Sequence, residues 1–255
     1  MKVELKKQLQ FLELGDLVSC IEDQETHSML YIDKSFDERL EIILENLVVL
    51  KERKLINKLI NAAGFKYKEA SIEGIDYENR KFDKNLIINL VKMGFVESAT
   101  DLLITGPTGS GKTYLGCAIG KEACKNKFRT LYIRCTLLAK KLDELSQNPK
   151  QYRTYLKKLS RYEILIFDEW LTFKAEPKEV KFFYELFEMR YDVHPTIIIS
   201  QFSSDEWHER LGGGNHADSI MDRIIHNSYE IPATQENIRR KLGAEKAQKL
   251  KDSIE

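Results

Sequence analysis

The sequence predicts an α/β protein in which a parallel β-sheet is flanked by helices and is preceded by a small all-helical N-terminal domain. Helical periodicity runs through residues 1–67, and short apolar runs alternate with amphipathic stretches from residue 68 onward. A glycine-rich loop joins the first apolar run to the next helical pattern. With 42% hydrophobic and 31% charged residues, the chain of 255 residues is globular rather than disordered or fibrous. We therefore predict two domains, residues 1–67 and residues 68–255.

Two helical patterns make up the predicted N-terminal domain. Leu5, Leu9 and Leu12 recur at the spacing of one helix face, and a capping box at residues 35–38 begins a second, longer helix that Gly64 ends. The apolar stripe of this second helix is expected to pack on neighbouring helices, while its basic side chains face water. The stripe consists of Leu40, Ile43, Leu44, Leu47 and Leu50, and the basic side chains are Lys51, Arg53, Lys54 and Lys58.

Four short apolar runs predict strands of the second domain, at residues 102–105, 130–134, 164–167 and 196–200. Residues 229–231 are a final strand candidate. Each of the first four is rich in Ile or Leu and precedes a helical pattern, which is the rhythm of βαβ units around a sheet that is buried on both faces. After Pro232 the sequence predicts one last charged helix that reaches the C-terminus.

The loop after the first predicted strand gives the strongest chemical signal. It reads Gly-Pro-Thr-Gly-Ser-Gly-Lys-Thr over residues 106–113 and matches GxxxxGK[ST] in full, between a strand and a helix. The backbone N–H groups of such a loop bind phosphates, so Lys112 is expected at the β- and γ-phosphates and Thr113 is expected to ligate Mg²⁺. The predicted ATP-binding residues are Gly106, Pro107, Thr108, Gly109, Ser110, Gly111, Lys112, Thr113 and Tyr114.

Two carboxylates follow the third predicted strand. Asp168 and Glu169 come directly after the apolar residues 164–167, at the carboxyl edge where open α/β sheets bind ligands. We expect Asp168 to hold Mg²⁺ together with Thr113, and Glu169 to polarise the attacking water as the general base. Because an adjacent pair of acids suits hydrolysis better than phosphoryl transfer to a small acceptor, the sequence predicts a Mg²⁺-dependent ATPase.

Polar side chains at three further places are candidates for the same site. Ser200 or Gln201, at the end of the fourth predicted strand, is expected to reach the γ-phosphate or the water, and both residues stay open as candidates. Arg223, on an amphipathic helix, is placed to reach the nucleotide of a neighbouring subunit and to stabilise the charge on the transferred phosphoryl group. Arg239, at the start of the last predicted helix, is a candidate for contacting the γ-phosphate in its own subunit.

Together these motifs resemble the IstB-like AAA+ ATPases, the helper proteins of insertion-sequence transposition, and their cousin, the bacterial helicase loader DnaC. The resemblance covers about residues 35–242. It rests on the P-loop, the strand that ends in Asp168-Glu169, the Ser200-Gln201 strand end, the segment Glu206-Trp207-His208-Glu209-Arg210-Leu211-Gly212 and the pair Asp222-Arg223. It implies head-to-tail homo-oligomers that hold each nucleotide between subunits, with Arg223 as the arginine finger, Arg239 as the sensor-II arginine and a truncated C-terminal lid.

The resemblance also implies DNA binding. The whole chain is neutral, with forty Lys and Arg against forty Asp and Glu, but its charge is unevenly placed. Residues 121–161 carry twelve basic and three acidic residues, with Tyr132, Tyr152 and Tyr155 among them, whereas residues 163–192 carry four basic and eight acidic residues. A basic tract of this kind predicts salt-dependent, largely non-specific binding to duplex DNA. The candidate DNA contacts are Lys140, Lys141, Lys150, Arg153, Lys157 and Lys158.

These features predict an ATP-dependent DNA-binding protein that assembles on DNA and assists a transposase, which its N-terminal helices engage. Two alternatives stay open: a DnaC-type loader would bind a replicative helicase, and a metabolic P-loop kinase would act as a monomer on a small acceptor. The four cysteines form no CxxC pair, and neither a signal core nor a membrane span is visible. A cytoplasmic protein without a disulfide framework, a zinc site or a membrane partner is therefore expected.

Overall fold

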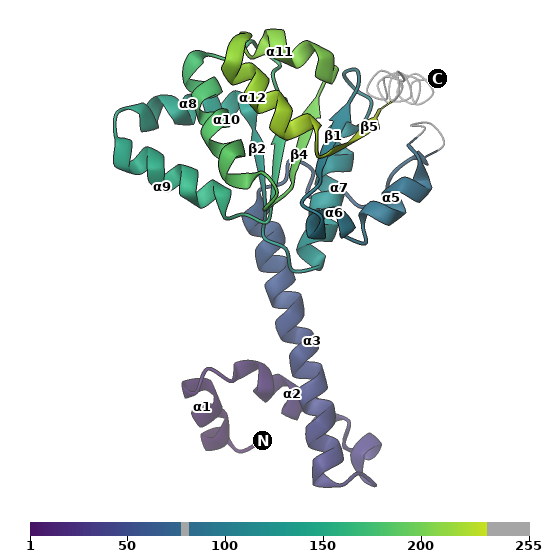
Figure 1. The fold of residues 1–255 in the computed structure, drawn as a ribbon. Coiled ribbons are helices and arrows are strands. Elements are labelled where there is room, and N and C mark those ends of the chain that lie inside the picture. Colours follow the sequence, from purple (N-terminus) through teal and green to yellow (C-terminus); the bar gives the residue numbers. More distant parts are fainter. Residues whose placement is uncertain (78–81, 234–255) are drawn as a thin grey trace, which may run out of the picture. The chain divides into compact units, whose positions relative to one another are not determined.

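A computed structural model describes residues 1–77 and 82–233, and the chain divides between Lys58 and Leu59 into two compact units (Figure 1). Each unit is described by itself. The long helix α3 (Phe36–Ala63) contributes to both, because its residues 36–58 lie in the first unit and its residues 59–63 lie in the second. The domain boundary expected between residues 67 and 68 stays a prediction.

The first unit is helical, as the periodicity predicted. It contains α1 (Val3–Phe11), α2 (Gly15–Thr26), the 3₁₀ turn η1 (Ser28–Tyr31) and most of α3. The capping box at the start of α3 is confirmed, because the Ser35 N–H donates to Glu38 Oε2 at 2.7 Å and the Glu38 N–H donates to Ser35 Oγ at 3.3 Å. Gly64 has a φ of +72°, the left-handed conformation that commonly ends a helix.

Part of the apolar stripe of α3 stays exposed. Gln24 of α2 donates to the Arg39 carbonyl oxygen at 2.8 Å and accepts from Arg39 Nε at 3.2 Å, and Ile43 is buried. Leu40 and Leu44, however, are 37% and 50% exposed. The expectation that the whole stripe packs on neighbouring helices is wrong, because apolar side chains extend around more of α3 than the other helices of this unit cover.

The second unit is built on a parallel sheet of five strands in the order β2-β3-β4-β1-β5. The strands are β1 (Asp101–Thr105), β2 (Thr130–Arg134), β3 (Ile164–Asp168), β4 (Thr196–Ser200) and β5 (Ser228–Pro232). Each predicted strand is confirmed to within one residue at either end. Because β3 lies between β2 and β4, with Arg134 opposite Asp168, the carboxyl ends of these three strands meet at one edge of the sheet.

Helices cover both faces of this sheet (Figure 1). On one face lie α5 (Lys84–Leu90), α6 (Gly94–Glu97) and α7 (Lys112–Lys125). On the other lie α8 (Cys135–Ser146), α9 (Pro149–Ser160), α10 (Pro177–Arg190), η2 (Ser204–Glu206), α11 (Trp207–Arg210) and α12 (Gly214–Ile225). The α/β class and the parallel sheet flanked by helices are thus as predicted.

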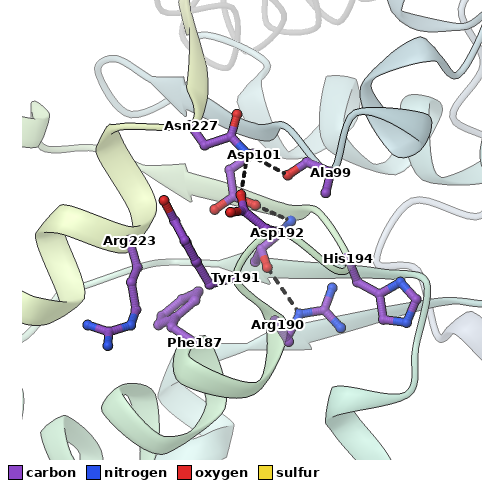
Figure 2. A pocket seen from close by; sticks show the side chains of 10 residues that line it. Ala99, Asp101, Phe187, Arg190, Tyr191, Asp192, His194, Arg223 and Asn227 are labelled. Carbon is purple, nitrogen blue, oxygen red and sulfur yellow. Dashed lines mark hydrogen bonds between the residues drawn. The ribbon is translucent and has the colours of Figure 1, made fainter.

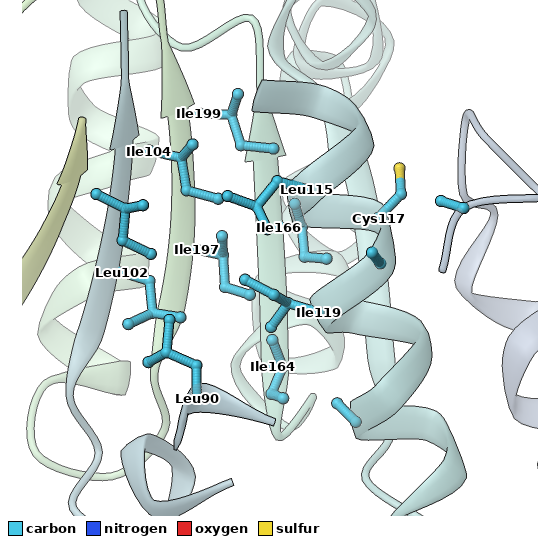
Figure 3. Packing of buried hydrophobic residues seen from close by; sticks show 14 of the residues in the cluster. Leu90, Leu102, Ile104, Leu115, Cys117, Ile119, Ile164, Ile166, Ile197 and Ile199 are labelled. Carbon is cyan, nitrogen blue, oxygen red and sulfur yellow. The ribbon is translucent and has the colours of Figure 1, made fainter. Parts of the chain in front are cut away.

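Helix α7 lies directly on its face of the sheet, where its side chains interleave with the isoleucines of the strands (Figure 3). A Cβ added at Gly116 would lie 2.4 Å from Ile199 Cδ1, and one added at Gly120 would lie 2.6 Å from Ile166 Cδ1. The two glycines are one helical turn apart, so they give α7 a side without Cβ atoms toward the sheet. This close approach fixes the start of α7 relative to β3 and β4.

On the opposite face, a cluster of aromatic side chains packs among aliphatic ones. Trp170 and Trp207 are fully buried, with ring centroids 6.1 Å apart, and Phe183 of α10 lies 4.5 Å from Trp170 in an edge-to-face arrangement. Trp207 Nε1 donates to the Phe202 carbonyl oxygen at 3.2 Å, which satisfies its buried N–H group. This cluster holds α10 and α11 against the carboxyl end of β3.

Several expectations concern residues 234–255, which lie outside the described residues: the last charged helix, the truncated lid and Arg239. All four cysteines are buried and unpaired. Among the helices of the described residues, none is both long and apolar enough to cross a membrane.

Candidate nucleotide-binding site

The predicted P-loop follows β1 and opens α7, as its motif requires. Gly106, Gly109 and Gly111 have φ values of +138°, +90° and +92°, which glycine adopts without steric cost. A Cβ at Gly106 would lie 2.4 Å from the carbonyl oxygen of Ala233, whose N–H donates to the Thr105 carbonyl oxygen at 2.7 Å. The loop therefore packs against the segment that follows β5, at the carboxyl edge of the sheet. The N-terminus of α7 lies at the same edge, and the backbone N–H groups of a helix N-terminus favour a bound anion.

Lys112 is nearly buried and folds over its own loop. Its Nζ donates to the carbonyl oxygens of Gly106 and Pro107, the second at 2.7 Å, and lies 3.4 Å from Ser110 Oγ. These contacts keep the ammonium group among the backbone groups of the loop. That location suits the predicted contact with the β- and γ-phosphates.

Asp168, 2% exposed at the end of β3, accepts hydrogen bonds from three donors. Tyr132 donates from its hydroxyl to Oδ2 at 2.5 Å, the Glu169 N–H donates to Oδ1 at 2.9 Å, and Thr113 Oγ1 donates to Oδ1 at 3.2 Å. Burial and the charge of Asp168 raise the pKa of Tyr132, so its phenol stays protonated and remains a donor. Tyr132 was expected only as part of the basic tract, and its place beside Asp168 was missed.

The side chains around Asp168 fit a Mg²⁺ ion. Thr113 Oγ1 and Asp168 Oδ1 approach to 3.2 Å, so two hard oxygen donors converge next to the phosphate loop. Mg²⁺ in nucleotide sites typically takes one or two such protein oxygens and fills its other positions with phosphate oxygens and water. The two predicted ligands are thus brought together, with Tyr132 orienting one of them.

Glu169 stands next to Asp168 in a separate network. Arg134 Nη2 lies 2.9 Å from Oε1, Thr136 Oγ1 donates to Oε2 at 2.8 Å, and Lys66 Nζ lies 3.5 Å from Oε1. Burial raises the pKa of Glu169, but the hydrogen bonds from Arg134 and Thr136 and the nearby positive charges outweigh it and lower the pKa below its usual value. With a φ of +61°, Glu169 also holds a left-handed backbone that costs a side-chain-bearing residue roughly 1 kcal/mol.

Ser200 and Gln201 are consecutive at the end of β4, but their side chains differ in burial and in hydrogen-bond partners. Ser200 is buried, where its hydroxyl donates to the Trp170 carbonyl oxygen at 3.0 Å and accepts from the Phe202 N–H at 3.1 Å. Gln201 is exposed, and its Oε1 accepts from Thr108 Oγ1 of the P-loop at 3.1 Å. Both residues line the same cavity as the P-loop, but of the two only Gln201 forms a hydrogen bond to a P-loop side chain within the described residues.

The P-loop, the carboxylates and Gln201 line a cavity of about 480 Å³ together with residues that the sequence did not point to. Lys66, Tyr67 and Glu69 form part of its wall, and the ring of Tyr67 lies 6.0 Å from that of Tyr114. The Tyr114 hydroxyl accepts from the Ser71 N–H at 3.3 Å. Residues 66–71 belong to a polar connection without a motif, so only the folded chain reveals that they border the site.

The segment Glu206–Gly212, on which much of the family resemblance rests, supports the loop behind Glu169. Arg210 donates from Nε to the Leu171 carbonyl oxygen at 2.6 Å and from Nη2 to the Thr172 carbonyl oxygen at 2.8 Å. The Ala175 N–H donates back to the Arg210 carbonyl oxygen at 2.8 Å. The segment thus fixes the turn that carries the chain away from the two carboxylates, and it does not itself line the cavity.

Arg223 lies at the opposite edge of the sheet from the P-loop. It lines a small pocket at the amino ends of β1 and β4, to which Asp101 and Arg190 also contribute (Figure 2). Its Nη1 donates to the Ser219 carbonyl oxygen at 2.8 Å, and its Nη2 pairs with Glu188 of α10. Arg223 therefore does not join the P-loop and carboxylates of its own chain.

The candidate DNA contacts fall on two consecutive helices between β2 and β3. Helix α8 carries Lys140 and Lys141, and helix α9 carries Lys150, Arg153, Lys157 and Lys158. Lys141 is paired with Glu144 at 2.7 Å, whereas the basic side chains of α9 form no ion pair with any described residue. Tyr152 donates to Glu185 Oε2 at 2.8 Å and Tyr155 stacks on Phe182, so both rings of the tract pack on α10 instead of joining the exposed basic row.

Comparisons with known sequences agree on one family. The family described as IstB-like ATP binding protein matches residues 7–246. A protein of Sinorhizobium fredii that is named as an insertion sequence ATP-binding protein is 26% identical over 238 residues, which are 93% of this chain and 94% of that protein. Another from the same organism, named in the same way, is 33% identical over 173 residues, or 68% of this chain and 70% of that protein.

Solved structures with the same fold include a DnaC helicase loader, with a TM-score of 0.55 and 20% identity over 65% of this chain and 97% of that chain. The replication initiator DnaA bound to AMPPCP and single-stranded DNA gives a TM-score of 0.56 at 19% identity, over 71% of this chain and 56% of that chain. At these identities the likeness shows the fold alone, which is that of AAA+ proteins. The P-loop geometry, this fold and the matched sequence pattern place the chain in the IstB-like ATP binding protein family, whose members are ATP-binding AAA+ proteins.

Proposed function

We propose that this protein hydrolyses ATP with Mg²⁺ and uses the cycle to assemble on DNA in support of a transposase. The observation that carries the ATPase part is the pair Asp168 and Glu169, which lines the same cavity as the P-loop residues Lys112 and Thr113, with Asp168 in hydrogen-bond contact with Thr113. The family, whose relatives are named for ATP binding in insertion sequences, supports the transposition part. Head-to-tail homo-oligomers, in which Arg223 reaches a neighbour's nucleotide, complete the proposal.

Each side chain has a separate task in the proposed hydrolysis. Thr113 and Asp168 hold Mg²⁺, which when bound neutralises charge on the phosphates. Lys112 binds the β- and γ-phosphate oxygens, and Gln201, which contacts Thr108 of the P-loop, orients the attacking water. Glu169 accepts a proton from that water as the general base, once its carboxylate leaves Arg134 and Thr136.

The Glu169→Gln variant tests this assignment. Because the amide keeps the size of the side chain but accepts no proton, we expect ATP binding to be retained and hydrolysis to fall by at least about a hundredfold. Equilibrium nucleotide binding and single-turnover hydrolysis measure the two effects, and Glu97→Gln, an exposed acid of α6, is the matched control. Loss of ATP binding in Glu169→Gln, or full hydrolysis, would contradict the assigned role.

For the DNA part of the proposal, the basic row of α9 is the contact surface. Lys150, Arg153 and Lys157 follow each other at i, i+3 and i+7, which places them on one side of the helix, and all three are exposed. Exposed cations attract phosphates without reading the bases, so binding is expected to depend on salt and little on sequence. Lys140, Lys141 and Lys158 extend the same surface in this proposal.

Replacing Lys150, Arg153 and Lys157 together by Gln tests the surface. If each contacts a phosphate, the slope of log affinity against log salt falls by about 2 to 3, because each lost contact removes roughly 0.9. The control replaces three exposed lysines elsewhere in the same unit, Lys92, Lys174 and Lys181, by Gln, with the same change in net charge. Equal loss of affinity in both triple variants would mean that overall charge, and not α9, binds the DNA.

A helicase loader of the DnaC kind remains the second candidate, favoured by the likeness of the fold to a DnaC helicase loader. The two functions differ in the partner. We expect the ATP-bound protein on DNA to stimulate strand transfer by a transposase encoded beside its own gene, and not to load a replicative helicase. Helicase loading without any effect on the transposase would support the loader instead.

A further inference from the structure

The turn that follows β3 holds two residues in a left-handed backbone conformation. Glu169 has a φ of +61° and Leu171 has a φ of +50°. The Thr172 N–H donates to the Glu169 carbonyl oxygen at 3.2 Å, which closes the turn over residues 169–172. Residues with a β-carbon rarely adopt this conformation, and it persists only where neighbouring groups enforce it. The backbone that carries the Glu169 carboxylate is therefore strained and depends on other parts of the chain.

Strand β4 holds the centre of this turn. The Trp170 N–H donates to the Ile199 carbonyl oxygen at 3.0 Å, and the Trp170 carbonyl oxygen accepts from Ser200 Oγ at 3.0 Å. The indole ring of Trp170 is fully buried in the aromatic cluster. These contacts fix Trp170, but they do not involve the carbonyl groups of the two residues that follow it.

The guanidinium group of Arg210 binds those two carbonyl groups. Its Nε donates to the Leu171 carbonyl oxygen at 2.6 Å, and its Nη2 donates to the Thr172 carbonyl oxygen at 2.8 Å. The guanidinium carbon lies 3.5 Å from the centre of the Phe202 ring, which favours one orientation of the group. A planar fork reaches two neighbouring carbonyl groups at once, and the single ammonium group of a lysine does not replace it. Arg210 thus fixes the orientation of both peptide groups.

We propose that Arg210 is a positioning residue for Glu169, an inference that rests on the proposed role of Glu169 as the general base. Arg210 does not line the cavity, so it acts through the turn. While its two hydrogen bonds persist, Leu171 keeps its positive φ and the Thr172 N–H stays on the Glu169 carbonyl oxygen. Without them Leu171 returns to a negative φ, the turn opens, and Glu169 loses the backbone that aims its carboxylate.

Nucleotide binding does not depend on this turn. Lys112 donates to carbonyl groups of its own loop, and Thr113 lies on α7, so both keep their places when the turn opens. The loss of Arg210 is therefore expected to lower the rate of hydrolysis and to leave the affinity for ATP in place.

Arg210→Met tests the proposal, because methionine keeps an unbranched apolar side chain beside Phe202 but has no donor for the turn. We expect kcat to fall about tenfold, while KM and the affinity for ATP stay within about twofold of the natural values. If Arg210→Met does not fold, Arg210→Lys takes its place. It keeps the positive charge but lacks the fork, and a loss of about threefold in kcat is expected.

Lys174→Met is the matched control. Lys174 joins the same two segments through an exposed ion pair with Glu209 at 2.7 Å. Within the described part of the chain, it donates to neither carbonyl group that Arg210 binds. Because exposed ion pairs contribute little, turnover of Lys174→Met should stay near that of the natural chain.

A double variant separates positioning of the base from a general loss of structure. If Arg210 acts through Glu169, adding Arg210→Met to Glu169→Gln should leave the remaining single-turnover rate unchanged within about twofold, since no base is left to position. A merely structural role would lower the rate by the same factor in both backgrounds.

Hydrogen exchange supplies a readout that does not depend on activity. In Arg210→Met without nucleotide, the Thr172 amide should exchange about tenfold faster or more, whereas the amides of β1 keep their natural rates. The proposal is overturned if the Thr172 amide exchanges no faster, if kcat stays natural, or if ATP affinity falls as much as kcat. Full hydrolysis by Glu169→Gln alone would instead refute the proposed general base, and the exchange rates would still decide whether Arg210 holds the turn.

Discussion

The end of β4 places two polar side chains of similar reach in different surroundings. Gln201 contacts Thr108 of the P-loop, so we expect Gln201→Ala to lower ATP turnover about tenfold, equivalent to roughly 1.4 kcal/mol of transition-state stabilisation. Its side chain is exposed, and the thermal stability of the chain should hardly change. Steady-state hydrolysis and a thermal melt, measured side by side, separate the two effects.

Ser200→Ala is the counterpart of this variant. It leaves the buried Trp170 carbonyl oxygen and the Phe202 N–H without their hydroxyl partner, so the free energy of unfolding should fall by about 1–3 kcal/mol. At temperatures where the variant is folded, turnover should stay near that of the natural chain. The reverse pattern, with lost turnover at full stability in Ser200→Ala, would make Ser200 the residue that acts on the nucleotide.

Asp101 makes the stability depend on pH. Burial raises the pKa of this carboxyl to about 8, far above the 3.8 of an unfolded chain, despite the hydrogen bond from the Thr196 N–H at 2.6 Å and the charge of Arg190. The folded chain therefore binds a proton that the unfolded chain has lost, and stability falls as the pH rises between these values. The slope is at most about 1.4 kcal/mol per pH unit. Denaturant unfolding at pH 5 and pH 8 measures it, and Asp101→Asn, which keeps the acceptor oxygen, should show a smaller difference.

At the level of residues, the sequence allowed us to predict the site residues that belong to a motif, but not the side chains that contact them. In a chain with a P-loop, a later apolar run that ends in two acids indicates the carboxylates of the nucleotide site, so Asp168 and Glu169 could be predicted. Tyr132, Arg134 and Thr136 reach these acids only through the register of β2 against β3. Local spacing does not encode that register, and no pattern in the sequence marks the three residues as part of the site.

Among the elements, α7 depends on close contact with the sheet. The Cβ of Gly116→Ala would overlap Ile199 Cδ1, and we expect a net loss of about 1 kcal/mol of unfolding free energy despite the better helix propensity of Ala. Ile199→Val removes that carbon, so the substitution at Gly116 should cost less when it is combined with Ile199→Val. Gly94→Ala, with open space around its Cβ, is the control and should not destabilise the chain. Equal costs with and without Ile199→Val would show that the contact is not the cause.

The predictability of the elements follows from how they are buried. The strands β1, β3 and β4 are buried along their whole length, so each appears in the sequence as an apolar run. The edge strands β2 and β5 are only partly buried, and they were predicted as well. The exposed stripe of α3 was not, because a pattern of apolar residues says which side chains avoid water and not which neighbour covers them. The tyrosines of α9 illustrate the same limit, since their spacing did not tell that they pack on α10.

At the scale of the whole molecule, the position of Arg223 bears on whether a single chain is expected to hydrolyse ATP. It lies at the sheet edge away from its own P-loop, so Arg223→Ala should leave nucleotide binding intact and abolish most turnover in the oligomer. Mixing it with Glu169→Gln chains should restore part of the activity, because an intact site in one chain then meets an intact arginine from the other. A mixture with the double variant Arg223→Ala/Glu169→Gln supplies no such arginine and serves as the control.

No recovery in the first mixture, with oligomers of normal size, would mean that Arg223 does not act on a neighbour's nucleotide. Recovery in both mixtures would mean that activity depends on assembly alone. The measurement is steady-state ATP hydrolysis as a function of the mixing ratio, beside the oligomer size from sedimentation.

Because the cysteines are buried in both units, the rate at which each thiol is alkylated can report local opening of its own unit. Cys20 lies within α2 of the first unit, and Cys117 and Cys124 lie within α7 of the second. Burial raises the pKa of each of these thiols, that of Cys117 to about 11, so the reactive thiolate is scarce while the chain stays closed. Alkylation then proceeds only through local opening, and its rate at each site reports how often the surrounding unit opens. Alkylation rates measured on the natural chain with and without ATP thus show whether ATP slows local opening of the nucleotide-binding unit alone or of the helical unit as well.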